Sequence, residues 1–220
     1  MQMLIPPLDD SALALALVDV GSGESVTVHD AERDSLLYVA RGSGSLSLDG
    51  ATSELTRASA ALVLAGEEAT IAGDELELVQ VTVGPSTERH APLGPRETVV
   101  AVDPGRVQQA LDSRGYQILL GPHNGSTRAT LFVGFVPPGR SPWHFHLYDE
   151  IVFIPQGPGR VHRAASQETQ SLTAGSAFRL RPREVHIVEN ASADEEMTVI
   201  GFFTPAGSPS AAYLAEPAPA

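Results

Sequence analysis

Four side chains in the second half of the chain have the types and the spacing of a metal site. His144 and His146 alternate with apolar residues, and residues two apart on a strand project from the same face, about 6.6 Å apart. Glu150 follows with the same parity, at the start of the next apolar run, where an intervening turn could return its carboxylate toward the two imidazoles. His186 begins a later apolar run, again after a turn. The spacing predicts that three imidazoles and one carboxylate converge on a single ion.

Two absences narrow the chemistry of this site. The 220-residue sequence contains no cysteine, and all 14 of its basic residues are arginines. A lysine imine, a phosphate-loop lysine, a cysteine nucleophile, a thiolate zinc site, an iron–sulfur cluster and a disulfide are therefore excluded. A set of nitrogen and oxygen ligands accepts Fe, Mn, Ni or Zn as one divalent transition-metal ion. An octahedral ion would keep two positions open, whereas a closed structural zinc site, the competing interpretation, normally includes cysteine.

These residues resemble the two sequence motifs of the cupin superfamily. The first motif is matched by Gly139, His144, His146, Glu150 and Gly157, and the second by Gly175, Pro182, His186 and Asn190. Glu184 stands where the second motif has glycine, a departure that affects a turn and not a ligand. The resemblance covers about residues 114–205 strongly and residues 20–90 weakly. It implies an all-β fold of two cupin-type barrels (double-stranded β-helix, or jelly roll) in tandem, a bicupin, with the metal bound by His144, His146, Glu150 and His186.

The rest of the sequence is consistent with a scaffold of short strands. Apolar runs recur about every ten residues between Gly, Pro, Ser and Asp, which is typical of a sandwich or barrel. The predicted strands are 25–28, 35–40, 45–48, 60–64, 76–83, 129–136, 150–154, 177–180 and 196–203. One short helix is predicted over residues 103–111, with Asp103 as its cap and Pro104 at its first position.

The two halves of the chain look like copies of one unit. The stretch 36–48 and the stretch 151–162 both read as an apolar strand, a Gly-x-Gly turn and a second strand, at an offset of 115 residues. We therefore predict an N-terminal degenerate barrel (1–95), a linker with the short helix (96–115), a C-terminal metal-binding barrel (116–205) and a flexible tail (206–220). At that offset His144 corresponds to His29, but His146 corresponds to Ala31, so the first barrel is expected to lack the metal.

Three further residues are candidate substrate contacts. Tyr148 and Trp143 flank the ligands and could wall a pocket. Arg179 shares its parity with Ala177 and Arg181 and not with the bulky Phe178 and Leu180, which makes it the arginine most suited to clamp an anionic group.

Charge restricts the partners. The formal net charge is −13, with 4 arginines against 15 acidic residues in residues 1–95 and 10 against 12 in residues 96–220. An acidic chain without basic stripes argues against nucleic acid as a partner. The less acidic second half is the better host for an anionic ligand.

No apolar run is long enough to cross a membrane. The run 12–18 follows two aspartates, where an export signal would have a basic segment. We expect a cytoplasmic protein, a monomer or a homodimer, that binds a small molecule.

Three functions fit this site. The leading hypothesis is an oxidoreductase of dioxygenase type that acts on a small anionic metabolite through two open metal positions. The alternatives are a metal-dependent isomerase of a sugar or sugar acid, which needs a general base beside the metal, and a noncatalytic module that binds metal and a small ligand. Fold analogy alone does not choose among them.

Overall fold

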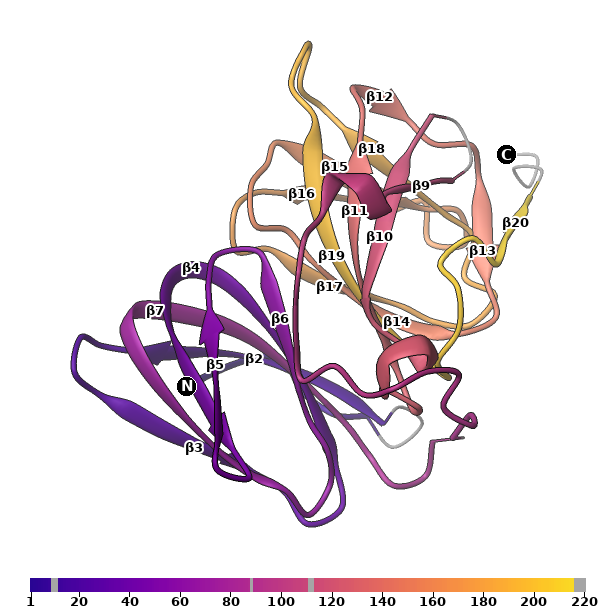
Figure 1. Cartoon of the computed structure of the whole chain (residues 1–220). Coiled ribbons are helices and arrows are strands. Elements are labelled where there is room, and N and C mark those ends of the chain that lie inside the picture. Colours follow the sequence, from indigo (N-terminus) through magenta and orange to yellow (C-terminus); the bar gives the residue numbers. More distant parts are fainter. Residues whose placement is uncertain (9–11, 88, 111–112, 216–220) are drawn as a thin grey trace.

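The computed structural model describes residues 1–8, 12–87, 89–110 and 113–215, and these are almost entirely β-structure. In Figure 1 the strands between residues 2 and 101 gather in one half of the molecule, and those between 108 and 214 gather in the other. Helical structure in the described ranges is limited to two 3-10 turns, η1 (Pro104–Arg106) and η2 (Pro122–Asn124). The predicted all-β class is confirmed. No described helix has the length and hydrophobicity needed to span a bilayer.

One eight-stranded antiparallel sheet forms the first half. Its main path runs β1-β2-β7-β4-β6-β8, while β3 pairs with β7 and β5 pairs with β4. The two longest strands, β4 and β7, pair with each other over most of their lengths and form the centre of this sheet. The bounds are β1 (Gln2–Ile5), β2 (Leu13–Val20), β3 (Ser25–His29), β4 (Asp34–Leu48), β5 (Ala51–Leu55), β6 (Ser59–Val63), β7 (Glu68–Val83) and β8 (Val99–Ala101).

The Gly-x-Gly sequence at residues 42–44 does not form the predicted turn between two strands. Strand β4 continues through it, with register shifts on either side of Arg41. Gly42 has φ +76, and a Cβ at this position would lie 2.1 Å from the carbonyl oxygen of Glu75 on β7. The glycine therefore permits a bulge in which two backbones approach closely, and the pairing resumes beyond it.

Two six-stranded sheets form the second half. One has the order β17-β14-β19-β11-β10-β9, and the other has the order β16-β15-β18-β13-β20, with β12 paired to β18. The bounds are β9 (Gln108–Gln109), β10 (Gly115–Leu120), β11 (Thr130–Val136), β12 (Gly139–Arg140), β13 (His144–His146), β14 (Asp149–Phe153), β15 (Gly159–Arg163), β16 (Thr169–Leu172), β17 (Ala177–Leu180), β18 (His186–Asn190), β19 (Met197–Thr204) and β20 (Ala212–Leu214).

Strands β11, β14 and β19 read as continuous apolar runs because both of their faces are buried. In register across the sheet, Phe132 lies opposite Gly201, and Gly201 lies opposite Val152. These residues face the interior of the second half. The alternate residues face the first half, where they join one core with its strands. That shared core includes Leu131, Val133, Ile151, Phe153, Ile200 and Phe202 from the second half and Leu13, Leu15, Leu36, Leu62, Val79 and Val81 from the first.

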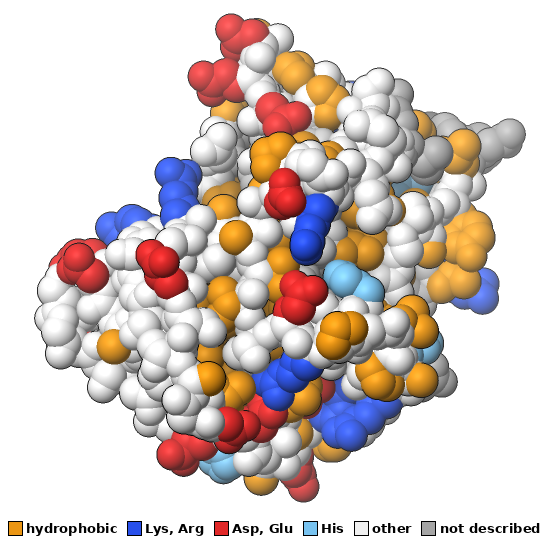
Figure 2. Space-filling view, viewed as in Figure 1, with side chains coloured by type: hydrophobic (Ala, Val, Ile, Leu, Met, Phe, Trp, Pro, Cys, Tyr) orange, Lys and Arg blue, Asp and Glu red, His pale blue; other side chains and the backbone are white. Residues whose placement is uncertain are grey.

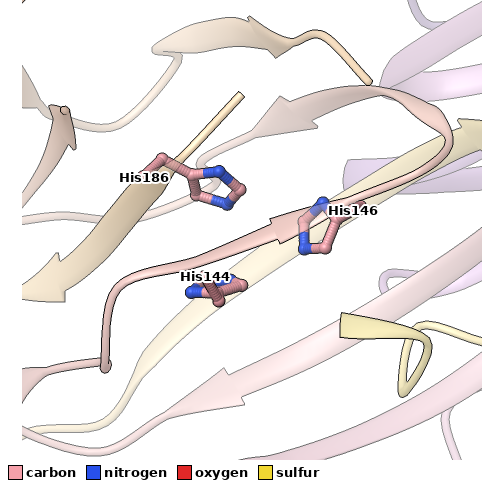
Figure 3. Close-up of side chains that lie close together, drawn as sticks. All are labelled: His144, His146 and His186. Atoms are coloured by element: carbon pink, nitrogen blue, oxygen red, sulfur yellow. The ribbon is translucent and has the colours of Figure 1, made fainter. Parts of the chain in front are cut away.

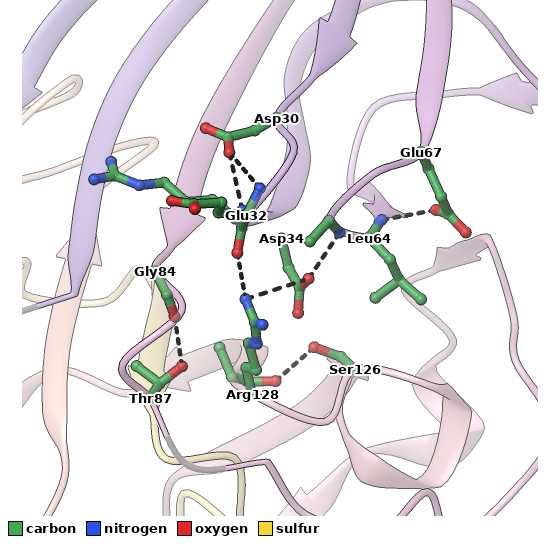
Figure 4. Close-up of polar contacts among 12 residues, drawn as sticks. Asp30, Glu32, Asp34, Leu64, Glu67, Gly84, Thr87, Ser126 and Arg128 are labelled. Atoms are coloured by element: carbon green, nitrogen blue, oxygen red, sulfur yellow. Dashed lines mark hydrogen bonds and ion pairs between the residues drawn. The ribbon is translucent and has the colours of Figure 1, made fainter.

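A buried ion pair also connects the two halves, as Figure 4 shows. Arg128 donates from Nη1 to the carbonyl oxygen of Glu32 at 2.7 Å, and the same nitrogen lies 3.8 Å from Oδ1 of Asp34. The Asp34 carboxylate also accepts a hydrogen bond from the backbone of Ala65. Both charged side chains are less than 10% exposed, 7% for Arg128 and 3% for Asp34. The pair therefore depends on the two halves keeping their relative position.

The connection between the halves differs from the predicted helix. In its described part, only the 3-10 turn η1 is helical, and Asp103 caps it by accepting from the backbone of Gly105. The predicted helix ends early because Gln108 and Gln109 pair as strand β9 with Gly115 and Tyr116. Residues 111–112 of the prediction lie outside the described residues. Sheet pairing in this segment prevails over a local helical preference of only two turns.

The segment expected to be a flexible tail carries a strand. Residues Ala212–Leu214 form β20, which pairs with β13 such that Ala212 lies opposite His146 and Leu214 opposite His144. The backbone of Ala215 donates to the carbonyl oxygen of Trp143. Strand β13 would otherwise expose unpaired backbone groups on this side, so the pairing satisfies them. Residues 216–220 lie outside the described residues.

Candidate metal centre

Three histidines from two adjacent strands face one another, as Figure 3 shows. His144 on β13 lies directly opposite His186 on β18 in the antiparallel register, and His146 follows two residues along β13 on the same face. The centre of the His144 ring lies 4.4 Å from that of His186 and 5.2 Å from that of His146, and the third separation is 4.9 Å. One ring nitrogen from each histidine lies within 4.8 Å of the others. The predicted convergence of the three imidazoles is present in the structure, but Glu150, which was predicted to join them, is not part of this group.

Hydrogen bonds at Nδ1 orient two of the three rings, and a carboxylate lies close to Nδ1 of the third. Nδ1 of His144 lies 2.9 Å from the carbonyl oxygen of Pro142, and Nδ1 of His186 lies 2.8 Å from that of Glu184. Nδ1 of His146 lies 3.1 Å from Oε2 of Glu150. Carbonyl oxygens accept hydrogen bonds, so Nδ1 carries the proton in neutral His144 and His186, and Nε2 of each of these two rings keeps its lone pair. Metal-binding histidines in proteins are held in this way.

The Nε2 atom of His186 tests whether the site fits a metal. This atom is buried and has no hydrogen-bond partner among the described residues. A buried acceptor without a partner costs free energy, which coordination to a cation would offset. Burial lowers the pKa of His186 well below its usual range, and the neighbouring His144 and His146 lower it further. The ring is therefore neutral at physiological pH, the form that binds a metal, and the residues present fit a metal ion.

His144 has the same preference for the neutral form. Burial lowers its pKa to about 4, and the nearby His146 and Arg114 contribute in the same direction, against the Pro142 carbonyl, which raises it. In the unfolded chain an imidazole has a pKa of about 6.5. Between about pH 4 and pH 6.5, the His144 side chain therefore binds a proton in the unfolded chain but not in the folded protein.

A pH dependence of stability follows for the metal-free protein. Below about pH 6.5 the unfolded chain binds protons at His144 and His186 that the folded protein does not bind, so the free energy of unfolding should fall as the pH falls. His144 alone should cost on the order of 3 kcal/mol between pH 7 and pH 4. Urea unfolding of chelator-treated protein at a series of pH values measures this loss. A stability that stays constant from pH 7 to pH 5 would contradict the lowered pKa values.

Glu150 is buried beside the histidines, and its position depends on a glycine. The carboxylate is 3% exposed and packs over Gly201 of β19, where a Cβ would lie 2.9 Å from Oε1 of Glu150 and 2.1 Å from Cε1 of Phe132. The absence of a side chain at this position therefore makes room for both the carboxylate and the aromatic ring. This requirement was not recognised in the sequence, where Gly201 is simply one residue of an apolar run.

Gly201→Ala should disturb fold and site together. The added methyl group must displace Phe132 or Glu150, and overpacking of this kind costs about 1–3 kcal/mol. We expect a lower urea midpoint and weaker metal binding, measured by dialysis against zinc. The matched control is Gly207→Ala, because a Cβ there comes no closer than 3.9 Å to the atoms around it. Equal metal affinity in the two variants would show that Glu150 does not depend on this space.

The histidines open into a cavity of about 340 Å³ in the second half. Glu150 is its single carboxylate and Arg114 its single cationic side chain other than histidine, among the described residues that line it. Tyr148 also lines the cavity, and its ring stacks on that of His146 at 4.6 Å and on that of Phe203 at 4.0 Å. Burial raises the pKa of the Tyr148 phenol, so the hydroxyl stays protonated. Tyr148 therefore supports His146 and forms part of the wall.

The structure places the other two predicted contacts away from this cavity. Arg179 donates to the carbonyl oxygen of Leu13 at 2.7 Å, which ties β17 to the first half. Its register partner on β14 is Ile151, which faces the shared core, so Arg179 lies on the outer face of the sheet. Trp143 borders a separate hollow with His162 and Thr169. Neither residue lines the cavity of the three histidines.

The other four histidines of the sequence lie elsewhere. His29 is exposed and bonds through Nδ1 to the carbonyl oxygen of Glu67. His162 bonds to Glu189 and Thr169, and His123 and His90 are exposed. In the described part of the chain, the three histidines of β13 and β18 are the one group of three or more potential ligands that come together.

Two parts of the cavity were missed in the sequence. Arg114 lies just before β10, in a segment that was assigned to the linker, and donates to the carbonyl oxygen of Val188 at 2.7 Å. Pro209, Ala212 and Leu214 belong to the segment assigned to the tail. The hydrophobic pattern gave no signal for either, because short connections and a three-residue edge strand lack a readable period.

Comparisons with known proteins support the fold. No family model and no curated protein sequence matches the chain. Among solved structures, a cupin 2 conserved barrel domain protein from Leptotrichia buccalis matches with a TM-score of 0.62 and 13% identity, over 90% of this chain and 86% of that one. Bacillus subtilis oxalate decarboxylase, described with Mn(II) centres, matches with a TM-score of 0.70 and 16% identity, over 93% and 71% of the two chains.

A third match is salicylate 1,2-dioxygenase from Pseudoaminobacter salicylatoxidans in complex with gentisate. Its TM-score is 0.70 and its identity 9%, over 88% of this chain and 69% of that one. At such low identities the similarity defines the fold and not the reaction. The chain therefore has the jelly-roll fold of cupin proteins, and it carries three histidines that could hold a metal.

Proposed function

We propose that the protein is a mononuclear metal-dependent oxidoreductase of dioxygenase type, acting on a small anionic metabolite. The metal would be one divalent ion, Fe, Mn, Ni or Zn, held by His144, His146, His186 and Glu150. The observation that carries this proposal is the buried Nε2 of His186, which has no partner among the described residues and belongs to a histidine that lies beside two further imidazoles.

The residues around the ion have separable tasks. A bound divalent metal supplies Lewis acidity and open positions for ligands. The carbonyl oxygens of Pro142 and Glu184 accept hydrogen bonds from His144 and His186, which fixes the orientation of these two rings before a metal binds. Tyr148 packs against His146, and the apolar walls exclude water from the ligand.

The cavity favours oxygen chemistry over isomerisation. Proton transfer between adjacent carbons needs a general base that is not itself a metal ligand. Glu150 is the single carboxylate among the described residues of the cavity, and it is assigned to the metal. The isomerase therefore remains the weaker alternative. Decarboxylation and ligand binding without turnover are the other possibilities within this fold, since an oxalate decarboxylase is among the similar structures.

We also propose that the chain is a bicupin with a degenerate first barrel. Three observations support this organisation. The first half has one eight-stranded sheet with an apolar core of its own, and the second half has two sheets around the cavity. The contact between the first half and the second half buries a core that they share. The proposed barrels run from β1 to β8 and from β9 to β20, so their sheets extend beyond the bounds 1–95 and 116–205 that were expected from the sequence. In this view the first barrel buries the outer face of β11, β14 and β19, which would otherwise be exposed.

Metal analysis of protein purified without an affinity tag tests the function. We expect close to one equivalent of iron, together with oxygen uptake by the iron form in the presence of a chelating carboxylate. Bound manganese or zinc, with no oxygen uptake by the iron-loaded protein, would favour the isomerase. Protein that binds no divalent metal after dialysis would overturn the proposal.

A further inference from the structure

The walls of the cavity indicate what kind of molecule enters it. We infer that the ligand is a carboxylate with a ring-sized, mainly hydrocarbon body, and not a polyol acid or a small dicarboxylate. This inference rests on the proposed function of the site and narrows the substrate class. It draws on the size of the cavity, the chemistry of its walls and the position of its one arginine.

The cavity is too large for a very small acid. Its volume of about 340 Å³ is roughly twice that of a cavity that holds one benzene molecule, about 150 Å³. A ring together with a carboxylate and one more substituent fills this space. A two-carbon dicarboxylate would leave most of the apolar lining in contact with water or empty, which gives little binding free energy.

Most of the cavity wall away from the histidines is hydrocarbon, and Gln109, Ser141 and Ser210 are polar exceptions in the lining. The interior face of the sheet contributes Phe132 from β11, Val152 from β14 and Val199 from β19, and β17 and β18 add Leu180 and Val188. Such side chains offer no hydrogen bonds. Each hydroxyl of a polyol that is buried here without a partner weakens binding by roughly tenfold. Hydrocarbon, in contrast, gains affinity from the same contacts.

The C-terminal segment adds to the apolar lining. Pro209, Ala212 and Leu214 line the cavity, and β20 is fixed in place by its pairing with β13. The Tyr116 and Tyr148 rings lie in the same lining, and their hydroxyls are directed to Gln108 and to the carbonyl oxygen of Pro209, respectively. The polar ends of these aromatic residues therefore bond to the protein, and their rings remain available to a ligand.

Positive charge is placed at the end of the cavity where the histidines lie. Arg114 lines the cavity and donates to the carbonyl oxygen of Val188, which lies two residues after His186 on the same face of β18. A divalent metal against the one carboxylate among the described lining residues would give this end of the cavity an excess of positive charge, which an anionic head group would neutralise. The rest of the surface is acidic, and Figure 2 shows acidic side chains spread over both halves on this face.

Mandelate and gluconate form a matched pair of probes. Both carry the same 2-hydroxycarboxylate head group, but mandelate continues into a phenyl ring and gluconate into a polyol chain. Calorimetric titration of the whole zinc-loaded protein avoids turnover. We expect mandelate to bind at least tenfold more tightly than gluconate. Equal or tighter binding of gluconate would overturn the inference.

Two variants separate the wall from the charge. Val199→Thr keeps the shape of the side chain but adds a hydroxyl to the lining, and should reduce the preference for mandelate by at least threefold. The matched control is Val161→Thr, because Val161 is buried in the same core but does not line the cavity. Arg114→Gln should weaken the binding of both probes by about tenfold at unchanged zinc content, whereas Arg160→Gln, at a surface ion pair, should not.

These measurements distinguish the two levels of the proposal. If the purified protein binds no metal, the proposed function fails, and titration of the same protein with the two probes still decides the ligand class. If metal is bound but Val199→Thr and Val161→Thr have the same preference, the apolar wall does not select the ligand and the inference fails.

Discussion

His186→Ala is expected to eliminate tight metal binding. The substitution removes the most deeply buried of the three imidazoles, at 1% exposure, and leaves His144 and His146 from a single short strand. Loss of a partner that merely orients a ligand costs about 10–100-fold in metal affinity, so loss of the ligand itself should cost more than about 100-fold. Competition with a chromophoric zinc chelator measures the affinity directly.

His162→Ala is the matched control for this experiment. His162 lies on β15, the other neighbour of β18, and bonds to Glu189 and Thr169 instead of the cavity. The substitution removes an imidazole of the same size from the same sheet. The zinc affinity of the His162→Ala variant should therefore remain within about threefold of that of the parent protein. If His186→Ala and His162→Ala bind zinc equally well, the three histidines do not form a metal centre, and the proposed function fails with them.

Alternation in the sequence predicted the relative placement of the site residues well. A strand places residues two apart on one face whatever surrounds it, so the pairing of His144 with His146 could be inferred from spacing alone. The strand beginning at His186 was likewise recognisable. The meeting of β13 with β18 depends on pairing between distant segments, which the resemblance to cupin motifs supplied and local patterning did not.

The same alternation does not say which face of a strand points into the cavity. Arg179 differs in parity from Phe178 and Leu180, as the sequence indicates, but those two residues occupy the interior. Arg179 therefore lies toward the first half, beside Leu13. A sheet that is covered on both sides has two apolar faces, so the composition of one strand cannot identify the ligand side.

Local sequence patterns also failed to predict the conformation of segments that pair with strands distant in the sequence. Strand β2 (Leu13–Val20) was considered only as an export signal, although it pairs along its whole length with β7. The segment around Gln108 became an edge strand where a helix was expected, and β20 formed in what was expected to be a tail. In each case the backbone hydrogen bonds of a neighbouring strand decide the conformation, and these are invisible to a local window.

Arg128→Met should destabilise the protein by about 3–5 kcal/mol, because it leaves the Asp34 carboxylate buried without its cation. The methionine retains the hydrocarbon stem of the arginine, so the loss reports on charge and hydrogen bonding more than on packing. Removal also leaves the carbonyl oxygen of Glu32 without the donor that it has in the structure. Urea unfolding monitored by circular dichroism gives the change in the free energy of unfolding.

The exposed pair Arg41–Glu77 provides the control, because Arg41 is 67% exposed and its nitrogen lies 3.7 Å from the carboxylate. Arg41→Met should cost less than about 1 kcal/mol. If the cost of Arg128→Met comes from an unpaired buried charge, the double variant Asp34→Asn with Arg128→Met should recover part of it. A cost for Arg128→Met as small as that for Arg41→Met would show that the ion pair makes no measurable contribution to holding the two halves together.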